Sequence, residues 1–235
     1  MKVPNATRRA DLIFVHAPWP NACLKRINAL LTVISSLTEK NGDFMKVPHA
    51  DPLNTTQSSN RPAGFEVNRL PSGGFALKLW GRFHSNWISS LSSGLSGNHI
   101  NIISGSAEKA KNLWQAEFEI TATRSFTSLN RIDYLSLAQS SLGSAAPADI
   151  SLDEFVLDDD LGKHAGTLYL EVKAKDQLGF LGALLSRCAF YTLFPEAMII
   201  ETVDGKIFDR FWIKGMAGRA PSDTATKMLR QKLEG

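Results

Sequence analysis

The sequence predicts an α+β protein in which one order of strands and helices occurs twice. Apolar residues that alternate with polar ones mark the strands, and apolar residues three and four positions apart mark the helices. An offset of 93 positions (170 − 77) predicts the repeat, because it brings residues of matching character together. The matched pairs are Leu77 with Leu170, Trp87 with Phe180, Ile88 with Leu181 and Leu91 with Leu184.

The first predicted region is residues 1–63, a strand and a helix followed by a polar linker. The strand covers 11–17, and the helix covers 21–42 with Asn21 as its N-cap and Gly42 at its end. Residues 48–62 are polar and read as an exposed loop. The pattern leaves open whether this region is a degenerate third unit or an arm that packs on the next one.

The second predicted region, 64–143, contains the first copy of the repeat. Two alternating runs around the turn "PSGG" predict a β-hairpin. A serine-rich helix of low intrinsic propensity follows, then two more strands and a second helix. The hairpin strands cover 65–70 and 75–83, the first helix 85–97, the next strands 99–107 and 112–122, and the second helix 128–141.

Residues 144–163 are rich in Ala, Pro and Asp and predict a solvated linker between two domains. A calcium loop is the weaker interpretation, since the alternation of its ligands is absent. The second copy is predicted over 164–235. It comprises a strand at 168–175, a helix from about 179, a hairpin around Asp204-Gly205, and a last helix with Ser222 as its cap.

The order βαββα in each copy predicts a ferredoxin-like sandwich, an antiparallel sheet with both helices on one face. The second copy also resembles the ACT domain, and most closely the C-terminal ACT repeats of the bifunctional uridylyltransferase/uridylyl-removing nitrogen sensor. The resemblance rests on "LYLEVKAKDQLGFLGALLSRC", on the following hairpin and on "DRFWIKG". Asp176, Gly179 and Leu181 match the family pattern D-x-x-G-x-L, whereas Leu178 stands where many members have proline.

This resemblance implies a non-catalytic regulatory module that senses an amino acid or a similar small metabolite, as in nitrogen metabolism. The implied ligand-binding residues are Asp176, Gln177, Leu178, Gly179, Phe180 and Leu181. Free backbone N–H groups in a first helical turn attract a carboxylate, while an acidic side chain there can meet an ammonium group or cap the helix. Equally, Gly179 can serve only close packing. Gly179→Ala should stabilise the fold by about 0.5–1 kcal/mol if the site is only structural and roomy, whereas under tight packing it should lower stability with or without ligand.

ACT domains pair side by side into one long sheet, so the resemblance implies either a homodimer or an internal pairing of the two copies. The first copy has Ser85 or Asn86 where the glycine is expected and lacks the acidic residue. A ligand-free scaffold that only mediates association is therefore the alternative function.

Other functional classes find less support in the sequence. The five histidines show no metal-ligand spacing, and no nucleophile-elbow, P-loop or dinucleotide motif occurs, so we expect no enzyme, metal or cofactor. His84 alone lies where a ligand could sit, although a solvated loop histidine is the simpler interpretation. The net charge of +3 argues against nucleic acid as a partner, although sheets with exposed aromatics can stack RNA bases.

The expected location is the cytoplasm. Two cysteines far apart in sequence do not form a disulfide framework and are typical of a reducing compartment. No apolar run is long enough to cross a membrane, and the N-terminal apolar run lacks a convincing cleavage site.

Overall fold

The computed structural model describes residues 62–125, 128–140, 150–160 and 164–234. The predicted strand at 11–17, the predicted helix at 21–42 and nearly all of the predicted loop 48–62 lie outside these residues. The described residues belong to one compact unit that begins at Thr56.

The first half of this unit contains four strands and two helices. They are β1 (Gly64–Arg69), β2 (Phe75–Gly81), α2 (Trp87–Gly97), β3 (Ile100–Ala110), β4 (Leu113–Ala122) and α3 (Tyr134–Gln139). The predicted hairpin is confirmed: β1 and β2 pair antiparallel, and the amide of Leu70 donates to the Gly74 carbonyl at 2.8 Å across the turn.

The second half has the same order of elements. They are β5 (Glu154–Asp160), β6 (Thr167–Lys175), α4 (Phe180–Phe190), β7 (Phe194–Val203), β8 (Lys206–Lys214) and α5 (Asp223–Glu234). Ser222 accepts a hydrogen bond from the amide of Ala225 at 3.2 Å, so its predicted role as the cap of the last helix is confirmed.

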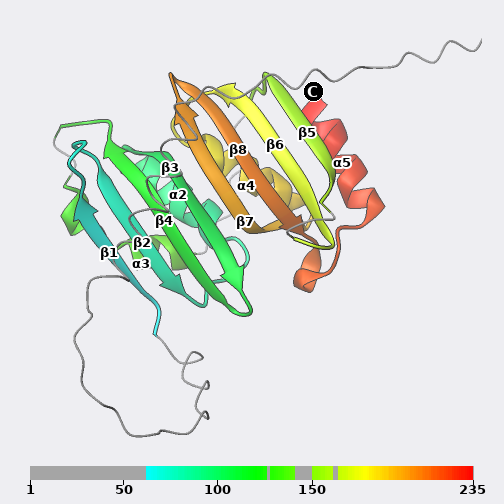
Figure 1. Cartoon of the computed structure of the whole chain (residues 1–235), viewed down its shortest axis with the longest axis horizontal. Coiled ribbons are helices and arrows are strands. Elements are labelled where there is room, and N and C mark those ends of the chain that lie inside the picture. The colour runs from blue at the N-terminus through cyan, green and yellow to red at the C-terminus, as the bar shows by residue number, and fades with distance from the viewer. Residues whose placement is uncertain (1–61, 126–127, 141–149, 161–163, 235) are drawn as a thin grey trace, which may run out of the picture. The chain divides into compact units, whose positions relative to one another are not determined.

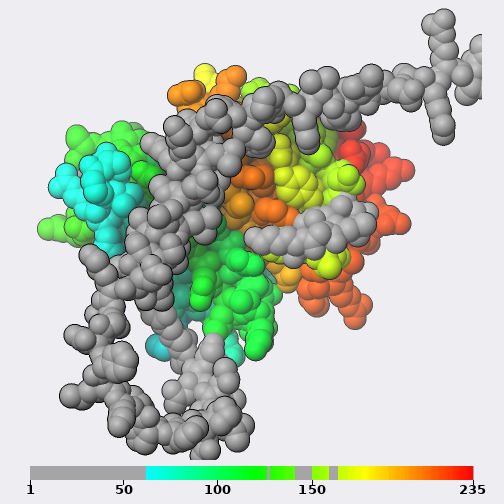
Figure 2. All heavy atoms as spheres, in the orientation of Figure 1, coloured from blue at the N-terminus to red at the C-terminus, as the bar shows by residue number. Residues whose placement is uncertain are grey.

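The eight strands of the described residues form one antiparallel sheet in the order β1-β2-β4-β3-β7-β8-β6-β5 (Figure 1). The α+β class is therefore confirmed. The two halves meet where β3 pairs with β7, and Figure 2, drawn from the same side, shows atoms of the first half, in green, in contact with atoms of the second half, in orange. An internal pairing, one of the two arrangements that the sequence suggested, occurs within a single chain.

The junction between β3 and β7 has an internal two-fold symmetry. Ser106 lies opposite Ile199, and these two residues are themselves 93 positions apart (199 − 106). The pairs on either side of Ser106 and Ile199 are related by the same offset. Adding 93 to Gly105 gives Met198, and subtracting 93 from Ile200 gives Ala107, so the pair Gly105–Ile200 corresponds to the pair Met198–Ala107. Helix α2, residues 87–97, likewise maps onto 180–190, the full extent of α4.

Small residues let α2 and α4 approach each other closely. Ser89 Oγ lies 2.7 Å from Ser186 Oγ, and it also donates to the Gly182 carbonyl at 3.2 Å. Ser89 and Gly182 are themselves 93 positions apart. A Cβ added to Gly182 would lie 2.8 Å from Ser93 Oγ. The serines that lower the helix propensity of α2 are thus explained by the contact they permit.

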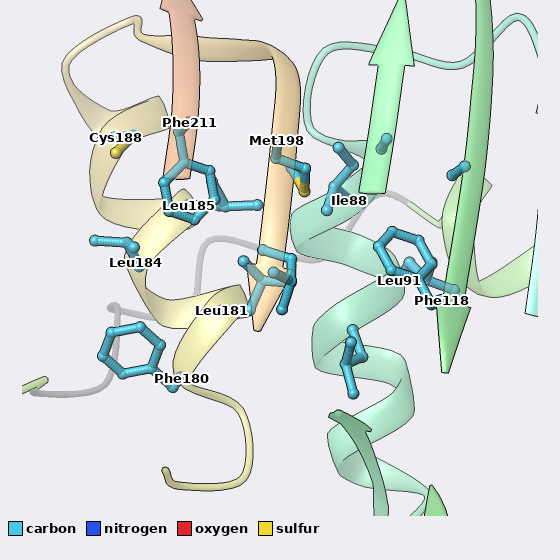
Figure 3. Packing of buried hydrophobic residues seen from close by; sticks show 14 of the residues in the cluster. Ile88, Leu91, Phe118, Phe180, Leu181, Leu184, Leu185, Cys188, Met198 and Phe211 are labelled. Carbon is cyan, nitrogen blue, oxygen red and sulfur yellow. The ribbon is translucent and has the colours of Figure 1, made fainter. Parts of the chain in front are cut away.

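A single apolar core lies between the helices and the sheet and continues across both halves. Figure 3 shows α2 contributing Ile88 and Leu91, α4 contributing Leu181 and Leu185, and Met198 of β7 between Ile88 and Leu185. Leu91 and its counterpart Leu184 are both fully buried. Burial of such side chains contributes about 1.5–3 kcal/mol each, so the core provides most of the stability of the shared sheet.

The prediction of a solvated linker over 144–163 is wrong for residues 154–160, which form strand β5 at the edge of the sheet. Leu157 is buried, whereas Glu154 and Asp158 on either side of it are exposed. Charged side chains on an edge strand discourage pairing with other chains, and here they hide the strand pattern. The second half therefore begins before the predicted boundary at 164.

The predicted helix over 128–141 is also shorter than expected. A 3-10 turn (Leu129–Arg131) precedes α3, which begins only at Tyr134. Asp133 breaks the helix because its carboxylate accepts hydrogen bonds from the amide and the hydroxyl of Ser136, at 3.0 and 2.7 Å.

Candidate functional site

The residues implied by the resemblance lie in the loop between β6 and α4 and in the first turn of α4. The amide of Asp176 donates to the Gly205 carbonyl at 2.9 Å, which fixes the loop against the β7–β8 turn. The amide of Phe180 donates to the Gln177 carbonyl at 3.1 Å and closes the turn that starts the helix. Leu181 is buried in the core.

Gly179 precedes α4 as its N-cap residue and has the left-handed angle φ +88°. A Cβ here would lie 3.0 Å from Ser96 Oγ, at the end of α2. The glycine is therefore required by its backbone angle and by a close approach between the two halves. The condition under which Gly179→Ala was expected to stabilise the fold, a roomy site within the helix, is not met, because the residue precedes the helix and a Cβ there would contact Ser96; the close-packing alternative is favoured.

A small pocket lies between the two halves at this point. Five of the six implied residues line it, whereas Leu178 does not and is 40% exposed. Across from them, the first half contributes Ser92, Asn101 and Ile102, among others. The cavity volume is about 30 Å³, enough for a water molecule or two but not for an amino acid.

One hydrogen bond crosses the pocket between the halves. Asn101 Nδ2, on β3, donates to Asp176 Oδ2 at 3.0 Å. The side-chain amide of Asn101 thus occupies the position beside the Asp176 carboxylate at which a ligand's ammonium group would bind. Sequence reasoning missed Asn101, because only the pairing of β3 with β7 brings it to this loop.

Asp209, on β8, is the second carboxyl in the pocket and was also missed. It is only 1% exposed, and it accepts a hydrogen bond from the amide of Glu201 at 3.2 Å. Burial is the main cause that raises its pKa from 3.8 to about 8, and the charges of Asp176 and Glu201 raise it further. Near neutral pH most of this carboxyl is therefore protonated.

The sequence did carry a signal for Asp209. In "KIFDRFWIK" the residue shares the alternation of Ile207, Phe211 and Ile213, so an acid takes a position on the buried face of the strand. A buried acid without a full ion pair is costly and often marks a functional site.

The pocket offers acceptors for a cation or an ammonium group and donors at the start of α4, whereas the buried Cys188 does not line it. Burial raises the pKa of Cys188 to about 12, so this thiol stays protonated. Among the described residues, no group of three or more metal-ligating side chains occurs.

His84 has a structural role at the start of α2. Its Nδ1 accepts from the amide of Asn86 at 3.2 Å, and its Nε2 lies 3.0 Å from the Ala138 carbonyl. The ring therefore connects the loop before α2 to α3. His84 is exposed in the loop before α2, as the sequence predicted, and these contacts add a structural role to that loop histidine.

Two further observations bear on classification. None of the helices in the described ranges is long and apolar enough to span a bilayer. No protein-family model matches the chain, and neither a curated protein nor a solved structure matches it.

Proposed function

We propose that the chain is a non-catalytic regulatory module in which two ferredoxin-like, ACT-like units pair internally and sense an amino acid or related nitrogen metabolite. The segments β2-α2-β3-β4 and β6-α4-β7-β8 supply the βαββ part of each unit. In a complete ferredoxin-like unit a fourth strand follows the second helix. Here the edge position is taken instead by a strand that precedes the unit, β1 in the first half and β5 in the second.

One observation supports a ligand site above all. Five of the six residues selected by the resemblance in the second half line one pocket together with Asn101 of the first half and a buried acid, Asp209. A fold that needed only close packing would place an apolar residue at that position of β8, as at Ile207 and Phe211.

The proposed ligand directs its ammonium group to Asp176 and Asp209 and its carboxylate to the free amides at the start of α4. Because the cavity holds only about 30 Å³, binding has to move the start of α4 away from the end of α2. That displacement is how occupancy could be transmitted, since both helices belong to the one core.

A thermal-shift screen of the full chain against the twenty amino acids and common nitrogen metabolites tests this proposal. A ligand at one hundred times its Kd should add about 2.7 kcal/mol to the free energy of unfolding. Affinity should rise between pH 6 and pH 8, since an ammonium group favours ionised Asp209. Asp209→Asn should abolish the ligand effect, and Asp204→Asn, an exposed turn residue, should preserve it.

The alternative is a ligand-free scaffold located, like the sensor, in the cytoplasm. It is favoured by the small cavity and by the close serine-glycine contact between α2 and α4. A screen in which no compound shifts the melting temperature of the wild type would reject the sensor and leave the scaffold, whose homodimer or other partner would then be sought by sedimentation and affinity capture.

A further inference from the structure

A second pocket lies between the same two halves, next to the loop that precedes α2. Its walls include Phe83, Lys109, Trp114, Phe194, Glu196 and Lys214, and its cavity volume is about 130 Å³. It is therefore several times roomier than the pocket at Asp176, and it can hold an organic molecule without a change in the fold.

The internal two-fold relates the two pockets. Subtracting 93 from Asp176, Thr202 and Ile207 gives Phe83, Lys109 and Trp114. Adding 93 to Asn101 and Ile102 gives Phe194 and Pro195. The positions that carry an acid, an amide and a hydroxyl in the first pocket thus carry two aromatic rings and a lysine in the second.

Aromatic side chains form one wall of this second pocket. Trp114 is 3% exposed, and its ring centroid lies 5.3 Å from that of Trp87. Trp87 in turn packs against Phe83, with 4.7 Å between ring centroids. A flat apolar group that enters beside Phe83 and Trp114 would extend this aromatic cluster, which favours offset or edge-to-face contacts.

The charge at the pocket is positive. Lys109 Nζ lies 3.8 Å from Glu196 Oε1, and Lys214 Nζ donates to the carbonyls of Ala165 and Gly166 at 2.9 and 3.0 Å. Two lysines and a single carboxylate therefore line the pocket, which leaves one positive charge in excess, and the neutral carbonyls bonded to Lys214 do not cancel its charge. An anionic group on the ligand would complete this arrangement.

We propose that this second pocket binds a small aromatic carboxylate, with its ring against Phe83, Trp114 and Phe194 and its carboxylate at Lys109 and Lys214. The inference rests on the shape and charge of this pocket and does not depend on amino-acid sensing at Asp176. The two related pockets would then take ligand groups of opposite charge.

Titration calorimetry of the full chain with phenylacetate tests the proposal. We expect saturable binding, with at least tenfold weaker affinity for benzyl alcohol, which lacks the charge, and for acetate, which lacks the ring. The Lys109→Gln/Lys214→Gln double variant should bind phenylacetate at least tenfold more weakly. Lys78→Gln, which removes a lysine paired with Glu117 at 3.7 Å elsewhere on the sheet, should bind as the wild type does.

Nuclear magnetic resonance localises the binding. Phenylacetate should shift the indole N–H signals of Trp114 and Trp87 and leave that of Trp212 unchanged. Absence of binding at millimolar concentrations overturns the proposal. So does equal affinity for benzyl alcohol, an unchanged affinity in a double variant that melts like the wild type, or a shift confined to Trp212.

Discussion

The two loops that lead into the paired helices occupy equivalent positions but have different backbones. Asn86 before α2 has φ −98°, whereas Gly179 before α4, 93 positions later, has φ +88°. His84 ties the first loop to α3, while Asp176 ties the second to Asn101 across the junction. Both helices nevertheless start at matching residues, Trp87 and Phe180.

The difference teaches which parts of the repeat are constrained. Leu91 and Leu184 lie at equivalent core positions, and both are fully buried. The loops differ more: the first is tied to α3 of its own half by His84, and the second to β3 of the other half by Asp176. The two halves differ clearly at the two pockets, where one carries carboxyl groups and the other aromatic rings and lysines.

The largest expected effect comes from breaking the shared core at equivalent points. Leu91→Ala and Leu184→Ala should each lower the free energy of unfolding by about 2–5 kcal/mol, because each leaves a cavity in a packed interior. Urea unfolding should give one transition for both variants, since one core spans the two halves. Two separate transitions, with each variant shifting only its own, would show that the halves are independent domains.

The contact between α2 and α4 gives the next largest effect. Gly182→Ala should cost about 1–3 kcal/mol, because the new methyl group would lie 2.8 Å from Ser93 Oγ. Gly97→Ala is the matched control in α2, since no atom lies within 4 Å of its added Cβ. Thermal melts that rank Gly182→Ala at or above the control in stability would contradict the close approach of the helices.

The pH dependence of stability sharpens the comparison of the pockets, because only one contains a buried acid. In the unfolded chain Asp209 loses its proton near its ordinary pKa of 3.8, whereas in the folded chain its pKa is about 8. The folded state therefore binds more protons between these values, and stability falls as the pH rises through this window. Between pH 6 and pH 8 the loss should be about 2 kcal/mol.

Asp209→Asn should remove this part of the pH dependence. Subtracting the variant's unfolding free energies from those of the wild type isolates Asp209 from other titrating groups, including Asp176, Glu201 and Arg210 around it. A difference that is constant from pH 6 to pH 8 would show that the carboxyl is ionised throughout.

The smallest effect is expected at the helix starts. Gly179→Ala should cost about 1–2 kcal/mol because a side chain disfavours the left-handed conformation. The equivalent Asn86→Ala should change stability by less than about 0.5 kcal/mol, since Asn86 has a negative φ and makes no side-chain cap. Equal melting temperatures for the two variants would remove the backbone argument for Gly179.

Much of the fold was predictable, because alternation and helical spacing are local. The hairpins, α2, α4 and the offset of 93 follow from apolar residues such as Leu77 and Leu170, whose spacing reports the period of each element. Strand β5 was missed because its acidic residues, including Asp158, resemble a solvated segment. Burial of Leu157 depends on a neighbouring strand that no local pattern reveals.

The candidate site was predictable only on one side. The loop from Asp176 to Leu181 was recognisable from its own residues, and the parity of Asp209 on its strand was visible although unused. Asn101 reaches the pocket only because β3 pairs with β7, and Ser92 only because α2 packs beside α4. The angle at Gly179 was likewise unpredictable, since the contact with Ser96 that accompanies it crosses the two halves.

A designed disulfide at the two-fold tests most directly whether the halves pair within one chain. Ser106 and Ile199 lie opposite each other on β3 and β7, and opposed residues in antiparallel strands have Cα atoms about 4.5–5.5 Å apart, within the range of a disulfide. Ser106→Cys/Ile199→Cys, oxidised at low concentration and mapped by mass spectrometry, should give this bond within a monomer. A bond only between chains, or none at all, would contradict the internal pairing.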